Sequence, residues 1–311
     1  YILNKMDYRK LIKFGENSYV ISLPTKWIKA NKLKKGDVIN IVEQDSTILI
    51  SPNEIKKDKT TISEVTIDLD KLKTLKYLRT HLTAAYINGF DQITIIWSNI
   101  NKETQKIREL TKNFIALEMI EQTPQRIILR EFVNLQEASL QESVRRIDRI
   151  VISMAEDAEN NMLGKGDYIE ILKQKDTDIS RMYHLIFRTI KCAQKPENRT
   201  TLKIDIGEML YYWELTTFLE RVANQIKRIP RYTPVKTNPK VIAAYKKLVE
   251  YYKETMKANY TKNINSAIDL INERKELFEE FESLSKYLPK TSQIMIEKMK
   301  NAADLTSQIS K

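Results

Sequence analysis

The stretch that most constrains this chain is residues 8–52, which read YRKLIKFGENSYVISLPTKWIKANKLKKGDVINIVEQDSTILISP. Its apolar runs and turn residues predict four strands and one short helix. The expected elements are strands at Lys10–Phe14 and Ser18–Leu23 around a turn at Gly15, a helix at Thr25–Asn31, and strands at Val38–Val42 and Thr47–Ile50. A piece of roughly 40 residues buries too little core to fold without a metal, disulfides or a partner. Because this stretch has no cysteine or histidine, we expect a partner.

The same residues resemble the AbrB/MazE/SpoVT family of swapped-hairpin DNA-binding domains. The matching features are Arg9-Lys10, the Gly15 turn, the Leu23-Pro24 step before a helix, and the Lys35-Gly36-Asp37 turn into the third strand. The resemblance implies that two chains interlace their hairpins into one barrel, whose basic face meets double-stranded DNA. The expected partner is therefore a second copy of the chain.

The charge balance agrees with an acidic partner but does not prove one. The net charge is +11, and residues 1–60 hold twelve basic and seven acidic side chains, nearly half of the excess. Such a balance is typical of proteins that bind nucleic acid or an anionic membrane face. A lysine-rich proteome would give the same excess, so charge alone leaves both interpretations open.

The candidate nucleic-acid contacts are Arg9, Lys10, Lys13, Asn17, Ser18, Lys26, Lys29 and Lys32. The first three are expected on the first strand, where alternation places Arg9 and Lys13 on one face. The last three recur every three residues and so share one face on or beside the short helix. Lysines contact phosphates, Arg9 is the candidate for reading guanine, and the Asn-Ser pair in the turn is placed to touch bases or sugars. A solvated basic face is the competing interpretation.

Length and composition bound the class of protein. With 311 residues, 42% of them hydrophobic, the chain is long enough for two or three domains. Its single cysteine, Cys192, cannot form an intrachain disulfide, which favours a reducing cytoplasm. No run approaches the roughly 18 apolar residues of a membrane helix, so we expect no membrane span, and we expect no signal peptide.

Residues 60–134 predict a small α/β connector domain, separated from the first domain by a charged linker at residues 53–59. The expected order is β-α-β-α-β-β, with helices on one face of the sheet. Its elements are a strand at Val65–Ile67, a helix at Leu69–Asn88 ended by Gly89, a strand at Ile93–Trp97, a helix at Asn101–Asn113, and strands at Leu117–Ile120 and Arg126–Leu129.

From residue 135 onward, apolar residues recur every three or four positions, which predicts an almost wholly helical half. The pattern falls into two sets of three helices, residues 135–232 and 238–311, and the stretch around Pro196 is expected to be a loop. The third helix of each set carries apolar-Glu-basic-apolar-x-Asn, as Leu219–Asn224 and as Ile296–Asn301. We therefore expect a duplication, with two three-helix units stacked or side by side.

The two sets resemble the halves of the PhoU family, through Leu219–Asn224 for its LERIAD-like helix and Lys175–Ile179 for its KDxEID-like helix. Residues 116–158 are similar to the junction of archaeal PhoU-type phosphate uptake regulators, which also carry an AbrB-like N-terminus. The resemblance implies a multidomain α+β protein: a dimeric swapped-hairpin barrel at residues 1–54, the connector, and a duplicated PhoU-like three-helix bundle.

In the PhoU family, E/D-x-x-x-D carboxylate pairs on facing helices bind metal clusters. Here each pair has lost one carboxylate, as in Glu220-x-x-x-Asn224, so we expect no tight multinuclear metal site and no cofactor. Glu220 and Glu297 are expected to form helix-packing hydrogen bonds instead. Residual metal binding at Asp176, Asp178, Glu220 or Glu297 is left open.

The remaining chemically notable residues have structural interpretations. His81 and His184 lack metal-binding spacing and are expected to be partly buried. Cys192 is expected to be buried, with slight activation beside Lys191 as the alternative. The Tyr211–Trp213 triplet is expected in the core or between the repeats. No ATP-binding or serine-hydrolase motif occurs, so we expect no enzyme activity.

Together, the two resemblances imply a homodimeric DNA-binding transcriptional regulator linked to phosphate uptake, whose helical half receives a signal from a partner such as a phosphate transporter component. The alternative is an adaptor that docks on a phosphate transporter and uses its N-terminal barrel only to dimerise. A metal-storing or redox bundle is a third hypothesis, disfavoured by the lost carboxylates.

Overall fold

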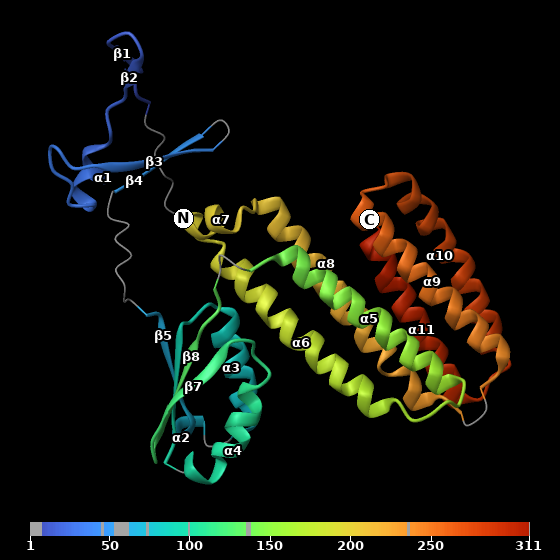
Figure 1. Ribbon diagram of the computed structural model, residues 1–311. Helices are drawn as coiled ribbons and strands as arrows, with labels where there is room; N and C mark the ends of the chain where they lie inside the picture. Colours follow the sequence, from blue (N-terminus) through green and yellow to red (C-terminus); the bar gives the residue numbers. More distant parts are fainter. Residues whose placement is uncertain are drawn as a thin grey trace. The chain divides into compact units, whose positions relative to one another are not determined.

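The computed structural model describes residues 8–44, 47–52, 62–72, 75–98, 100–134, 138–234 and 237–310. The chain divides into two compact units, Tyr1–Thr61 and Ile62–Lys311. Figure 1 shows the helices and strands of each unit. The linker expected at residues 53–59 lies outside the described residues.

The first unit is built from two β-hairpins and a short helix. Its elements are β1 (Ile12–Phe14), β2 (Ser18–Val20), α1 (Thr25–Ala30), β3 (Ile39–Gln44) and β4 (Thr47–Pro52). β1 pairs antiparallel with β2 and β3 pairs antiparallel with β4, and in the described residues these remain two separate sheets. Gly15 and Gly36, with φ of +71° and +96°, adopt the left-handed conformation that the two turns require. The order of elements predicted from the sequence is confirmed.

This unit has no hydrophobic core of its own in the described residues. None of its described side chains is buried, and only a few, such as Trp27 and Ile28 of α1, are half-buried. Phe14 is 70% exposed, Ile41 62% and Ile48 65%. Because burial of apolar surface is the main force that stabilises a fold, one copy of this unit lacks its principal source of stability.

The second unit begins with a small α/β part. Its elements are β5 (Glu64–Asp68), α2 (Leu69–Leu72), a 3-10 turn η1 (Leu75–Tyr77), α3 (Leu78–Ile87), β6 (Gln92–Ile96), α4 (Ile100–Thr111), β7 (Leu117–Gln122) and β8 (Arg126–Glu131). The sheet order is β5-β6-β8-β7, with β5 parallel to β6 and the other neighbours antiparallel. Helices α3 and α4 lie along one side of this sheet (Figure 1). Ile93, Ile95 and Leu129 are fully buried in its core.

The helix expected at residues 69–88 is wrong as a single element. Only its C-terminal half is a continuous helix, α3, which ends where predicted, at Gly89 with φ +84°. The N-terminal turn, α2, is held separately, because the Asp70 carboxylate accepts hydrogen bonds from the Ser98 hydroxyl at 2.6 Å and from its backbone N–H. These hydrogen bonds hold α2 against the end of β6, so α2 does not continue into α3 as one helix.

The rest of the second unit is helical. Its elements are α5 (Leu140–Met162), α6 (Ile169–Cys192), α7 (Pro196–Leu202), α8 (Ile206–Ile226), a 3-10 turn η2 (Ile229–Tyr232), α9 (Pro239–Thr261), α10 (Ile264–Ser285) and α11 (Lys290–Ile309). The loop expected around Pro196 is instead the short helix α7. Pro196 is its first residue. At this position a backbone N–H would have no partner within the helix, so its absence in proline costs nothing, and the fixed φ of proline suits a helix.

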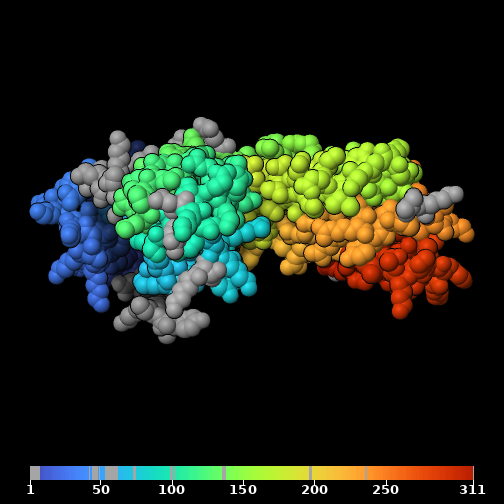
Figure 2. Space-filling view, turned by 90° about the horizontal axis from the view of Figure 1, so that it is seen from below, coloured from blue at the N-terminus to red at the C-terminus, as the bar shows by residue number. Residues whose placement is uncertain are grey.

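The six long helices share one hydrophobic core rather than forming two independent bundles. Buried residues from α5, α6 and α8 and from α9, α10 and α11 belong to the same cluster. The two sets meet side by side where α8 packs on α11 and α5 packs on α9. Tyr245 of α9 donates a hydrogen bond of 3.0 Å to the carbonyl of Ala155 in α5, across this interface. In the space-filling view these yellow, orange and red helices form a continuous surface (Figure 2).

A buried ion pair joins the α/β part to the helices. Arg188 of α6 is only 3% exposed, and its Nη2 donates to the Glu131 carboxylate at 2.7 Å. Its Nη1 donates to the backbone carbonyls of Tyr86 at 2.7 Å and Phe90 at 3.0 Å. The guanidinium also lies over the Tyr86 ring, 5.1 Å from its centroid. This single side chain therefore binds α3, the turn after it and β8 at once.

Several predictions about single residues are wrong. His81 on α3 is exposed, whereas His184 is half-buried as expected and stacks on Phe114 with ring centroids 5.3 Å apart. Burial raises the pKa of the Cys192 thiol, which contradicts activation. Tyr211 and Trp213 are 41% and 50% exposed and so lie outside the core, but the Tyr211 hydroxyl bonds to Asn259 of α9 and thus lies between the repeats, as the alternative prediction had it. Tyr212, the middle residue of the triplet, does pack against the helical core.

Candidate nucleic-acid interface

The candidate interface residues of the N-terminal hairpin are all exposed, but fewer lie on strands than predicted. Because β1 starts at Ile12, only Lys13 of the three N-terminal cations belongs to it, opposite Tyr19 of β2. Arg9 and Lys10 precede the strand, so the predicted alternation of Arg9 and Lys13 on one strand face is wrong. Asn17 lies in the turn as expected, whereas Ser18 is the first residue of β2 and pairs with Phe14.

Helix α1 presents the second group of cations. Lys26 and Lys29 are exposed on the helix, while Trp27 and Ile28 are half-buried. Lys32 lies beyond the helix, so it extends the lysine series through a turn and not along the helix face. Within the described residues, these three lysines form no ion pair that would neutralise them.

Lys32 has an unusual backbone conformation. Its φ is +53°, and the Leu33 N–H donates to Ile28 O at 3.0 Å while the Lys32 N–H donates to Lys29 O at 3.1 Å. This is a Schellman termination, in which glycine or asparagine usually occupies the left-handed position. A lysine here costs about 1 kcal/mol relative to glycine. The left-handed conformation determines the direction of the Cα–Cβ bond of Lys32.

The turn before β3 supplies two cations that the sequence interpretation did not include. Lys34 and Lys35 are exposed, and the Lys34 N–H donates to the Asp37 carboxylate at 2.6 Å while the Asp37 N–H donates back to Lys34 O at 3.1 Å. Gly36 takes the positive φ that this turn requires. The signal was present in the sequence, since Lys34-Lys35 adjoins the Gly36-Asp37 turn that was recognised.

The structure thus gathers the candidate residues into two groups within one unit. Lys13, Asn17 and Ser18 belong to the β1–β2 hairpin, and Lys26, Lys29 and Lys32 belong to α1 and its C-terminal turn. No hydrogen bond or ion pair between described residues joins the two groups. Chemically, each group offers exposed ammonium groups that suit phosphate oxygens.

The acidic residues of the helical half are engaged with nearby cations or amides. Asp176 forms an ion pair with Lys227 at 2.5 Å. Glu220 accepts a hydrogen bond of 2.5 Å from Asn224, which lies on the same helix, α8. Asp178 faces Arg181 at 3.7 Å, and Glu297, 61% exposed, lies 3.3 Å from the adjacent Lys298. The prediction that Glu220 and Glu297 bridge helices is therefore wrong, because their polar contacts lie within their own helices. Burial raises the pKa of Glu220.

The described part of the chain contains no group of side chains suited to a metal ion. There, no three side chains of the types His, Cys, Asp and Glu gather closely enough to hold one. Lys227 is bonded to Asp176, near Glu220. Its ammonium group occupies a position where a metal cluster would need an oxygen ligand instead. In the described segments, no helix has both the length and the apolar character to cross a bilayer.

Comparison with known proteins adds one finding, and it concerns the first unit. Neither the curated proteins nor the solved structures gave a match to the chain. Residues 12–59 match the model of a family described as "Antidote-toxin recognition MazE, bacterial antitoxin". The match runs from the start of β1 past the end of β4 and so covers both hairpins and α1, which carry most of the candidate interface residues.

Proposed function

We propose that this protein is a homodimeric DNA-binding transcriptional regulator linked to phosphate uptake, with its helical half as the sensor or partner module. We further propose that the helical half binds and does not catalyse. One observation carries the proposal. Residues 12–59 match a MazE-type family model, and the unit they belong to has no buried side chain among its described residues.

Dimerisation is the first step of the proposal. Side chains such as Phe14, Ile41 and Ile48 face solvent in one copy, although they are large apolar groups that are usually buried. Exposed apolar clusters of this kind mark protein–protein interfaces. Interlacing of two copies would give these side chains a common core, and a symmetric dimer would present its basic groups twice.

DNA binding is the second step. The lysines on and after α1, together with those of the hairpin, carry unneutralised positive charge on the one unit that resembles a DNA-binding family. Ammonium groups bind backbone phosphates with little sequence preference, so we expect strong salt dependence. A two-fold dimer would favour an operator with two-fold symmetry.

The link to phosphate uptake is the third step and rests on the resemblance of the helices to the PhoU family. The arrangement of two three-helix sets around one core supports it, because a duplicated bundle is what that resemblance implies. Measurement of promoter occupancy by this protein in cells grown at high and at low phosphate tests this step. Occupancy that ignores phosphate would refute it.

The central experiment measures binding of the intact protein to duplex DNA from upstream of its own gene, by fluorescence anisotropy at several salt concentrations. Lys26→Glu with Lys29→Glu reverses two exposed charges on α1 and is expected to weaken binding by about a hundredfold at low salt. The matched control is Lys102→Glu with Lys106→Glu on α4, which makes the same change in net charge on exposed lysines of the second unit.

Each outcome of this experiment decides between the hypotheses. Selective loss with the α1 variant supports the proposed interface. Equal loss with both pairs would reduce the effect to overall charge and refute the assignment to α1. No binding by the wild-type dimer, even at low salt, would refute DNA binding and favour an adaptor that uses its first unit only to dimerise.

A further inference from the structure

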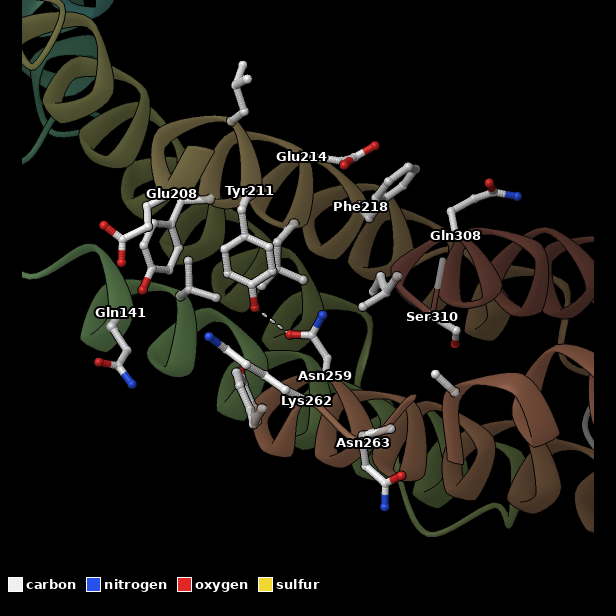
Figure 3. A pocket seen from close by; sticks show the side chains of 18 of the residues that line it. Gln141, Glu208, Tyr211, Glu214, Phe218, Asn259, Lys262, Asn263, Gln308 and Ser310 are labelled. Carbon is white, nitrogen blue, oxygen red and sulfur yellow. Dashed lines mark hydrogen bonds between the residues drawn. The ribbon is translucent and has the colours of Figure 1, made fainter. Parts of the chain in front are cut away.

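A hollow on the helical half lies at one end, where the two three-helix sets meet. It has a volume of about 910 Å³, within the range of small-molecule sites. α5, α8, α11 and the turn from α9 to α10 all contribute to its lining. Figure 3 shows the Tyr211 hydroxyl pointing toward Asn259, with Lys262 beside them. The Tyr211–Asn259 hydrogen bond, 2.5 Å long, crosses the hollow from α8 to α9.

The walls combine an apolar interior with an aromatic edge. Leu215, Phe218 and Ala267 are in contact with the hollow, and Ile309 closes it from α11. Leu210 and Ile264, which also line the hollow, are 56% and 74% exposed. A ligand with a flat apolar body would bury these side chains and the Tyr211 ring.

Two cations in the lining lack a carboxylate partner. Neither Arg145 nor Lys262 forms an ion pair with any described residue, and the Arg145 guanidinium instead lies 4.5 Å from the centroid of the Tyr260 ring. The nearby buried carboxylate, Asp148, accepts hydrogen bonds from Tyr252 at 2.8 Å and from Tyr260 at 3.1 Å.

The two acidic residues of the lining do not neutralise these cations. The Glu208 carboxylate is engaged at the N-terminus of α8, where it accepts a hydrogen bond of 3.0 Å from the Asp205 N–H. Figure 3 shows the Glu214 carboxylate on the far side of α8 from Lys262. Lys262 is therefore the cation left to meet a ligand, and Arg145 adds a positive charge that is partly offset by Asp148, whose pKa it lowers against the effect of burial.

Two further features belong to the lining. Lys262 has φ +52° because it ends α9 as Lys32 ends α1: the Asn263 N–H donates to Ala258 O at 3.0 Å and the Lys262 N–H to Asn259 O at 3.2 Å. The Ser310 hydroxyl, which also lines the hollow, is buried and has no hydrogen-bond partner among the described residues. A buried polar atom without a partner is costly and suggests that a ligand group supplies the missing bond.

From these observations we infer that the hollow between the two helix sets binds a small organic anion: a flat apolar body against Tyr211, Phe218 and Ala267, with a carboxylate or phosphate group toward Lys262 and Arg145. Because α5 and α8 belong to one set and α9 to α11 to the other, a bound ligand would bridge the two sets. The inference gives a chemical class to the signal of the proposed sensor half, but it is independent of DNA binding.

The test uses the intact protein and two fluorescent probes that differ in one group. Anilinonaphthalene sulfonate has an aromatic body and an anionic group, and N-phenylnaphthylamine is the same body without the charge. We expect the sulfonate to bind more tightly than the neutral probe. Lys262→Gln should weaken sulfonate binding by about fivefold and leave the neutral probe unchanged, because a charged hydrogen bond at an exposed lysine contributes modestly.

Two further variants locate the probe. Ala267→Trp fills the hollow from α10 and should abolish binding of both probes, with circular dichroism as the check on folding. Lys203→Gln is the matched control, since Lys203 is also an exposed lysine with positive φ after a helix, but lies outside the lining. It should leave both affinities unchanged.

Displacement then separates the two possible anionic groups. 2-Naphthoate and 2-naphthyl phosphate, which share a flat aromatic body, are each titrated against the bound sulfonate probe, and the stronger competitor identifies the headgroup class. The inference is overturned if the sulfonate and neutral probes bind equally, if folded Ala267→Trp retains binding, if Lys203→Gln acts like Lys262→Gln, or if neither competitor displaces the probe. None of these measurements involves DNA, so failure here is distinct from failure of the proposed function.

Discussion

Replacement of Arg188 by methionine tests how the α/β part is held to the helices. The change keeps a long side chain but removes the guanidinium that donates to Glu131 and to the Tyr86 and Phe90 carbonyls. Glu131 is itself only 8% exposed, so its carboxylate would remain buried without a cation. Removal of one partner from a buried ion pair typically costs about 3–5 kcal/mol, and we expect a loss of unfolding free energy in that range.

The pH dependence gives a second, independent readout. Burial already raises the pKa of Glu131, against the opposing effect of Arg188. Without Arg188 that pKa rises further, and the folded state then takes up a proton more readily than the unfolded state. Stability lost near neutral pH should therefore be partly regained as the pH falls through that raised pKa. Glu131→Gln in the Arg188→Met background should restore part of it at all pH values.

Urea unfolding followed by tryptophan fluorescence measures these effects. With Trp27 and Trp213 replaced by phenylalanine, the remaining Trp97 reports on the α/β part, which it packs against. Arg181→Met, on the same helix, is the control, because Arg181 is 40% exposed and 3.7 Å from Asp178. A surface pair of this kind contributes about 0–1 kcal/mol. Equal destabilisation by the two variants, or a loss below about 1 kcal/mol for Arg188→Met, would refute the reasoning.

Three other predictions concern separate sites. Lys32→Gly should raise the unfolding free energy of the first unit by about 1 kcal/mol, because glycine relieves the positive φ, while weakening DNA binding; a stability decrease in thermal melts would contradict this. Phe14→Ser should raise the dimer dissociation constant more than a hundredfold, since each copy loses roughly 1.5–3 kcal/mol of burial. Sedimentation measures it, and a dimer unchanged from wild type would be inconsistent with interlaced hairpins. Burial raises the pKa of Asp148. The wild-type protein should therefore lose stability, relative to Asp148→Asn, as the pH rises above about 4 through that raised pKa. A stability difference in urea melts that does not change with pH would contradict the raised pKa.

The local elements of this chain could be predicted because their causes are local. Gly15, Gly36 and Gly89 adopt positive φ at the turns and helix end where the sequence placed them. The apolar period of residues 140–309 identified six long helices, since each must bury one stripe. The absence of cysteine and histidine in a short β-rich stretch likewise led to the expectation of a partner, and the described residues of that unit are indeed unburied.

The candidate interface was predictable in part for the same reason. Exposed lysines near a turn are a compositional feature, so Lys13, Lys26 and Lys29 lie on the elements expected for them. The strand start at Ile12 moved Arg9 and Lys10 off β1, because the end of a strand depends on which residues its partner can pair. Lys34 and Lys35 were missed, although they adjoin a recognised turn.

Tertiary structure alone decided the features that join distant residues. No local pattern marks Arg188 as the residue that reaches three backbone and side-chain acceptors on the α/β part. The same holds for Tyr211, whose apolar neighbours suggested a core but which faces a hollow closed by α9 and α11. Sequence periodicity reports which face of a helix is apolar. Which helix packs against that face, and which part of the face stays exposed, depends on the tertiary structure. The packing of the two helix sets therefore decided where the proposed ligand site lies.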